Sequence, residues 1–185
     1  TVIEDTAYVV RSDGKIFKIA GFRENNPKIH TYQISGLDSN GIESLEFDAK
    51  NKRLLFAIKE YNNRKETKGI YTFNLTTQKV IKERLFTLDG ADEIYQKLRG
   101  GKSSQIIRPS SIRFHPTTGE LYILEGNQPK LIILDQDGNE AKIHLLDPET
   151  FTQPEGLAFD EENRLYISNE SRRQPANILR VKLND

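Results

Sequence analysis

A segment that occurs three times in this 185-residue chain restricts its fold more than any other sequence feature. The copies read IESLEFDAKNKRLLFAIKE, PSSIRFHPTTGELYILEG and PEGLAFDEENRLYISNE, and they align at Phe47, Phe114 and Phe159. The last two copies lie 45 residues apart, since Ser110 of one aligns with Glu155 of the other. A period near 45 residues with four short strands per unit is typical of a β-propeller blade.

The copy that begins at Pro109 shows the strands of such a unit most clearly. Its first strand is followed by LYILE, KLIIL and AKIHLL, which are separated by turns containing glycine or proline. A β-sandwich also consists of alternating strands, but it would not place an acid or serine, a phenylalanine and an apolar strand in register three times. We therefore predict an all-β propeller of four-stranded antiparallel blades.

The spacing of the copies also predicts how the chain is divided. The first residues match only the second to fourth strands of a blade, so the inner strand of that blade is expected before Thr1. The excess length between two copies predicts an insertion with a short helix around 89–98, which Asp89 or Asp92 would cap. A single domain, 1–185, would then contain a partial blade at 1–35, blades at 41–84, 108–147 and 152–185, and an insertion at 85–107.

Composition excludes several functions. The 27 basic and 27 acidic residues cancel, so no net field attracts the molecule to nucleic acid. The absence of cysteine removes disulfides, thiolate nucleophiles and zinc–cysteine sites. No apolar run approaches the roughly 20 residues that span a bilayer. The sequence also contains no glycine-rich phosphate-binding loop, so it predicts no organic cofactor.

The repeated polar residues are predicted to meet at one rim of the propeller. In a blade, the start of the inner strand and the end of the next strand lie on the same face. The copies therefore bring sequence-distant side chains together around the mouth of the central channel. The expected pairs are Glu43 with Glu60, Ser110 with Glu125, and Glu155 with Asn169 or Glu170.

Clustered carboxylates suit a hard cation such as Ca²⁺, because oxygen ligands and negative charge favour it. The candidate metal ligands are Glu43, Glu60, Glu125, Glu155 and Glu170. The candidate ligand-binding residues are Ser110, Asn169 and two arginines, Arg11 and Arg108, which would balance the acids or hold an anionic ligand. Alternatively, each glutamate accepts backbone N–H groups and joins neighbouring blades.

The three histidines do not support acid–base catalysis at this rim. His115 follows Phe114 at the opposite end of the inner strand, and His30 and His144 fall in expected outer strands. Ser110 consequently lacks an evident base, so no serine hydrolase and no catalytic residue is predicted.

The segments SIRFHPTTGELYILEG, QPEGLAFDEENRLYISNES and AYVVRSDGKIFKI resemble the SdiA-regulated, YjiK-like propeller proteins of bacteria. The resemblance implies a propeller of roughly five or six blades, a periplasmic or cell-surface location, and an export signal or lipoprotein anchor before Thr1. The Glu-Gly or Ser-Gly motif of the family matches at Glu155–Gly156 and departs at Glu43–Ser44 and Ser110–Ser111, where serine replaces glycine.

Three functions remain open at this point. The first is a monomeric envelope protein that binds a small-molecule or protein ligand at an acidic rim, with Ca²⁺ as a candidate cofactor. The second is a metal-dependent phosphoesterase or lactonase-like hydrolase, in which the cation activates water. The third is a module that only binds other proteins.

Overall fold

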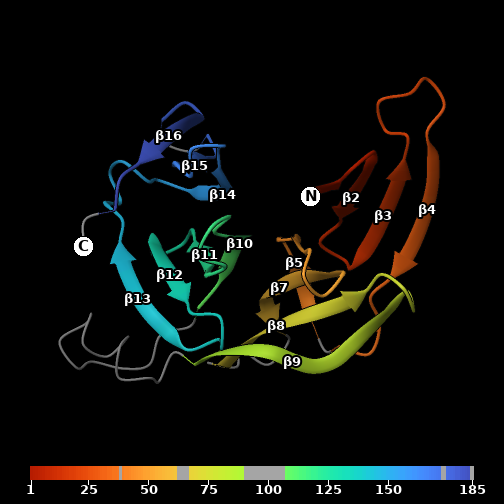
Figure 1. Ribbon diagram of the computed structural model, residues 1–185. Helices are drawn as coiled ribbons and strands as arrows, with labels where there is room; N and C mark the ends of the chain where they lie inside the picture. Colours follow the sequence, from red (N-terminus) through yellow and green to blue (C-terminus); the bar gives the residue numbers. More distant parts are fainter. Residues whose placement is uncertain (38, 62–66, 90–106, 172–173, 184–185) are drawn as a thin grey trace.

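The computed structural model describes residues 1–37, 39–61, 67–89, 107–171 and 174–183. Four antiparallel sheets are arranged around a common centre as the blades of a β-propeller (Figure 1). This arrangement confirms the all-β fold and the four blades predicted from the repeat. No helix occurs among the described residues.

Within each sheet the strands follow chain order from the centre outward. The first sheet contains β1 (Val2–Ile3), β2 (Thr6–Val10), β3 (Lys15–Ala20) and β4 (Lys28–Gln33). In the second, β5 (Ser39–Ile42) and β6 (Glu46–Asp48) share the inner position beside β7 (Arg53–Tyr61), followed by β8 (Thr67–Asn74) and β9 (Lys79–Asp89). The third contains β10 (Pro109–Phe114), β11 (Leu121–Glu125), β12 (Lys130–Leu134) and β13 (Glu140–Leu145). The fourth contains β14 (Pro154–Phe159), β15 (Leu165–Asn169) and β16 (Asn177–Val181).

Two expectations about element boundaries require correction. The inner strand of the first sheet was expected to lie before Thr1. Instead, β1 (Val2–Ile3) occupies the inner position of this sheet. Strand β9 extends to Asp89, so residues 85–89 belong to the second sheet and Asp89 does not cap a helix. The remainder of the expected helix, including Asp92, lies outside the described residues.

The turn between the first two strands of a copy is held by the residue that follows the aligned phenylalanine. Asp48 accepts a hydrogen bond from Arg53 Nε at 2.8 Å, and Asp160 accepts one from Arg164 Nε at 2.6 Å. In the third sheet His115 takes this position, and its Nδ1 accepts two backbone N–H groups of the turn. These contacts explain why aspartate and histidine exchange at this position, since both provide an acceptor.

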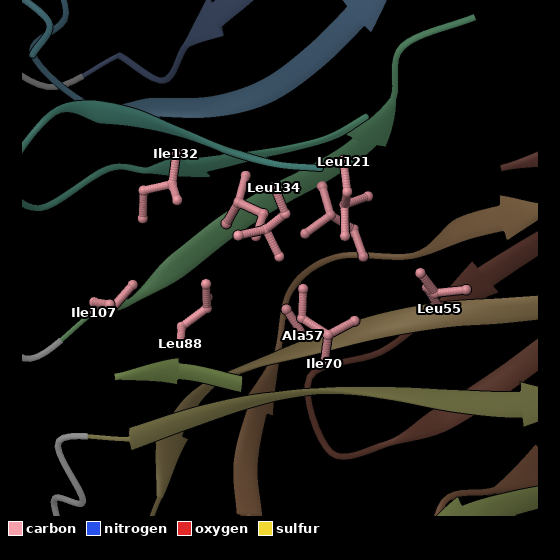
Figure 2. Close-up of a cluster of buried hydrophobic side chains, with 10 residues drawn as sticks. Leu55, Ala57, Ile70, Leu88, Ile107, Leu121, Ile132 and Leu134 are labelled. Atoms are coloured by element: carbon pink, nitrogen blue, oxygen red, sulfur yellow. The ribbon is translucent and has the colours of Figure 1, made fainter. Parts of the chain in front are cut away.

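The hydrophobic core lies between adjacent sheets. The third sheet is covered on both faces, and every residue of β11 and β12 is buried. Its inner strand, β10, contacts β6 and β7 on one side and β14 on the other. Figure 2 shows the cluster between the second and third sheets, which includes Leu55, Ala57, Ile70, Leu88, Ile107, Leu121, Ile132 and Leu134. Burial of each leucine or isoleucine contributes roughly 1.5–3 kcal/mol to folding.

Candidate functional site

The inner strands are irregular at the same place in three sheets. The ladder of β10 shifts register at Ser110, and the ladder of β14 shifts at Glu155. In the second sheet the ladder is interrupted between β5 and β6, and Glu43 lies in this break. A β-bulge leaves one residue unpaired and changes the direction of its side chain. The three aligned residues of the repeat are therefore the residues released from the ladders.

These residues line one pocket of about 690 Å³ at the end of the central channel, which we call the rim pocket. All four sheets contribute to it, and its volume is typical of a small-molecule site. Of the predicted site residues, the structure brings Glu43, Ser110, Glu155, Asn169 and Glu170 together here. The full lining is Val10, Ser12, Ile42, Glu43, Lys59, Ser110, Gln153, Glu155, Ser168, Asn169 and Glu170.

The strand register also determines which residues lie at the end of the neighbouring strand, just beyond these irregularities. The equivalent ladder pairs are Ile42 with Ile58, Pro109 with Glu125, and Pro154 with Asn169. The residues that follow these partners are Lys59, Gly126 and Glu170. The same structural position thus has a positively charged side chain in the second sheet, a glycine in the third and a negatively charged side chain in the fourth.

One predicted metal ligand lies elsewhere than expected, and the side-chain position of a second is not described. Glu60 pairs with Asn40 in the extension of β7, and its side chain lies outside the described residues. Glu125 is buried, with Lys130 Nζ 2.6 Å from its Oε2, and it does not line the rim pocket. Burial raises the pKa of Glu125, while Lys130 opposes this effect. The prediction is wrong for Glu125 because the third sheet is covered on both faces, so the whole of β11, including this strand end, is buried.

The charges of the rim pocket are coupled through Lys59 and Gln153. Lys59 Nζ lies 2.5 Å from Glu43 Oε2 and 3.9 Å from Glu155 Oε1. The amide of Gln153 donates to Glu155 Oε1 at 3.4 Å and to Glu170 Oε2 at 2.7 Å. Burial raises the pKa of Glu155, and the neighbouring acids Glu43 and Glu170 raise it further, against the opposing effects of Lys59 and Gln153.

Asn169 contributes a buried polar group to this pocket. Its Nδ2 donates to Asn177 Oδ1 at 2.8 Å and to the carbonyl of Thr150 at 3.4 Å. Its Oδ1 is buried and accepts no hydrogen bond from the described residues. The side chain therefore retains an acceptor that no described residue uses.

Ser110 acts mainly as a connection between blades. Its hydroxyl lies 2.9 Å from the carbonyl of Pro154 in the fourth sheet and 3.3 Å from that of Leu124 in its own sheet. A single hydroxyl proton is thus directed to a backbone acceptor, which leaves Ser110 unsuited to act as a nucleophile.

The two predicted arginines are separated by the structure. Arg11 pairs with Asp13 on an exposed turn, with 2.5 Å between Nη2 and Oδ2, and it does not line the rim pocket. Arg108 lines an adjoining pocket of about 320 Å³, which we call the side pocket. The side pocket is formed by Lys59, Arg108, Gly126, Asn127, Gln153 and Glu155.

A second charged cluster lies further along the inner strands and was not predicted. Glu46 of β6 accepts hydrogen bonds from Arg113 Nη1 at 2.6 Å and from the backbone N–H of Phe114 at 3.2 Å. Arg113 Nε donates to the carbonyl of Leu157 in β14 at 3.3 Å. Burial raises the pKa of Glu46, and Arg113 opposes that shift. This cluster connects three sheets and leaves no carboxylate oxygen for a ligand.

Within the described part of the chain, no group of three or more acidic, histidine or cysteine side chains is arranged to hold a metal ion. No histidine lines the rim pocket or the side pocket. None of the described segments forms a helix able to cross a membrane.

The four sheets and the rim pocket define a β-propeller with a polar site at the end of its channel. The sequence model of the SdiA-regulated family matches residues 18–174, so the chain belongs to that family. The family resemblance seen in the sequence is thereby confirmed. A comparison with curated proteins finds no significant match.

Solved structures with low sequence identity share the fold. A Bacteroides thetaiotaomicron protein of unknown function is 17% identical with a TM-score of 0.61, and the match covers 91% of this chain and 40% of that one. Kuenenia stuttgartiensis hydrazine synthase is 8% identical with a TM-score of 0.57, covering 96% and 42%. A chain of a nidogen–laminin complex is 14% identical with a TM-score of 0.58, covering 96% and 63%. The chain thus spans less than two thirds of each of these structures.

Proposed function

We propose that this propeller is a binding protein that holds a small polar ligand in the rim pocket. One observation carries the proposal: two bulges and the equivalent break of the second sheet release Ser110, Glu155 and Glu43 from their ladders, and all three line a single pocket. Bulges are enriched beside functional sites, because they redirect a side chain at the cost of a ladder hydrogen bond. A location in the bacterial envelope, expected from the family resemblance, belongs to the same proposal.

The sequence analysis left open that the glutamates serve to join neighbouring blades. In the structure, other side chains make such contacts. Ser110 and Arg113 donate to backbone carbonyls of the fourth sheet. In contrast, Glu155 and Glu170 share the amide of Gln153, a residue of their own blade. Among the described residues, their only contact with another blade is the 3.9 Å approach of Glu155 to Lys59 of the second sheet, so both carboxylates remain available to a ligand.

A divalent cation is the second candidate occupant. The shared hydrogen bonds from Gln153 place Glu155 and Glu170 near each other, and carboxylate oxygens are the ligands that Ca²⁺ and Mg²⁺ prefer. Lys59 already supplies positive charge between Glu43 and Glu155, which limits the gain from a metal ion at that side of the pocket.

Thermal unfolding in the presence of a small-molecule library, Ca²⁺ or Mg²⁺ tests this proposal. A ligand at a hundredfold excess over its Kd should stabilise the full-length protein by about 2.7 kcal/mol. Glu155→Gln should weaken that effect, while Arg11→Gln, a surface control outside the pocket, should leave it unchanged. Failure of every compound and cation to bind, or equal shifts in the parent and Glu155→Gln, would refute the proposal.

A further inference from the structure

The rim pocket carries an excess of negative charge. Among the described residues, three carboxylates line it, those of Glu43, Glu155 and Glu170, together with one ammonium group, that of Lys59. Because Lys59 lies 2.5 Å from Glu43 and 3.9 Å from Glu155, it compensates the first acid more than the second. A positively charged ligand group therefore gains most beside Glu155 and Glu170.

The unused acceptor of Asn169 independently indicates a ligand with N–H groups. The side chain is 4% exposed and lines the rim pocket, and its Oδ1 accepts no hydrogen bond from the described part of the chain. Its orientation is determined by the carbonyl of Thr150, which can only accept and therefore faces Nδ2. A buried oxygen without a donor is unfavourable, and an ammonium group provides three donors.

The side pocket has the opposite character. Lys59 and Arg108 line it with one carboxylate, that of Glu155. Gly126 also lines it, whereas the equivalent positions of the second and fourth sheets carry Lys59 and Glu170. A Cβ atom at Gly126 would lie 2.8 Å from the carbonyl oxygen of Pro154 and 3.4 Å from Glu155 Oε1, so a side chain cannot be added without movement. A guanidinium and an ammonium beside an open space favour an anionic group.

The two pockets adjoin, because Lys59, Gln153 and Glu155 line both of them. We infer that the ligand is a small zwitterion, with its ammonium group between Glu155, Glu170 and Asn169, and its anionic group beside Arg108 and Lys59. This inference rests on the proposed function, since it names the class of ligand for the same site.

Four probes of equal chain length distinguish the contributions of charge: 4-aminobutyrate, butylamine, butyrate and butyramide. Their binding to the full-length protein is measured by ligand-detected NMR titration, with thermal unfolding as a control for folding. The variants are Glu155→Gln in the rim pocket, Arg108→Gln in the side pocket, and Arg11→Gln as a matched surface arginine. Each lost charge-assisted hydrogen bond should weaken binding by about tenfold or more.

The zwitterion 4-aminobutyrate is expected to bind most tightly and butylamine next. Glu155→Gln should weaken both, whereas Arg108→Gln should reduce 4-aminobutyrate to the level of butylamine and leave butylamine unchanged. The inference of a zwitterionic ligand is refuted if butyrate or butyramide binds as tightly as 4-aminobutyrate, or if Arg108→Gln does not change the affinity for 4-aminobutyrate. The proposed function stands in either case. If neither these probes nor any compound or cation of the thermal screen binds, the proposed function itself fails.

Discussion

The inner strands carry charged residues in two regions that behave differently. Toward the middle of these strands, Glu46 and Arg113 lie within regular ladders and pair with each other across two sheets. At the rim, Glu43 lies at a break and Glu155 at a bulge, and the ammonium group of Lys59 lies near both carboxylates. We call the first set the ladder charges and the second, together with Glu170, the rim charges.

This difference shows how one strand serves two purposes. A ladder residue has a fixed direction, so Glu46 and Arg113 meet reproducibly and connect the second, third and fourth sheets. A bulge residue is released from that constraint, and its side chain turns toward the channel. We expect the ladder charges to contribute to stability and the rim charges to contribute to binding.

The largest expected effect comes from the buried pair beneath the rim. Lys130→Met should destabilise the protein by about 4 kcal/mol, because it removes the ammonium group that compensates the buried carboxylate of Glu125 and leaves it mainly the backbone N–H of Arg108. Urea unfolding measures this loss. The matched double variant Glu125→Leu/Lys130→Met should recover most of it, since an apolar pair replaces the ions. A single variant as stable as the parent would show that the ion pair contributes nothing.

The ladder charges should show the next largest effect. Arg113→Leu removes the partner of Glu46 and the hydrogen bond to the carbonyl of Leu157, so we expect a loss of about 2–3 kcal/mol in urea unfolding. Adding Glu46→Gln should restore part of the stability, because the neutral amide is less costly to bury. An unchanged unfolding midpoint for Arg113→Leu would contradict a connecting role.

A smaller effect is expected from pH. The pKa of Glu155 is raised by burial above its ordinary value of 4.5, so the folded state holds this proton more tightly than the unfolded chain. The resulting stabilisation is present below pH 4.5 and is lost as the pH rises through the raised pKa. The stability of the parent relative to Glu155→Gln should therefore fall as the pH rises above 4.5. Urea unfolding of both proteins at a series of pH values measures this relative stability. A parent that becomes more stable relative to Glu155→Gln as the pH rises would contradict the prediction.

The repeat was sufficient to predict the propeller and the alignment of Glu43, Ser110 and Glu155, because these features depend on periodicity alone. It did not identify Lys59, since the end of β7 was aligned at Glu60. Counting five residues on from Leu54, the ladder partner of Phe47, reaches Lys59 and would have corrected the register.

Pairs between distant residues were beyond prediction from the repeat. Glu46 and Arg113 are 67 residues apart, and only the packing of one sheet on the next brings them together. The same holds for the buried state of Glu125, because a carboxylate at a strand end is compatible with both the rim and the core. The positions of the β-bulges could likewise not be predicted from the polar–apolar pattern of the sequence.

The division between ladder and rim charges is tested most directly by urea unfolding of Glu155→Gln/Glu170→Gln. The two substitutions remove both negative charges but keep the size of the side chains. The new amide oxygens can still accept hydrogen bonds from Gln153. Because the one described contact of these carboxylates with another blade is the long, partly exposed approach of Glu155 to Lys59, at 3.9 Å, the free energy of unfolding should stay within about 1 kcal/mol of the parent. A loss of about 3 kcal/mol or more, comparable with that of Lys130→Met, would show instead that the rim charges hold the blades together.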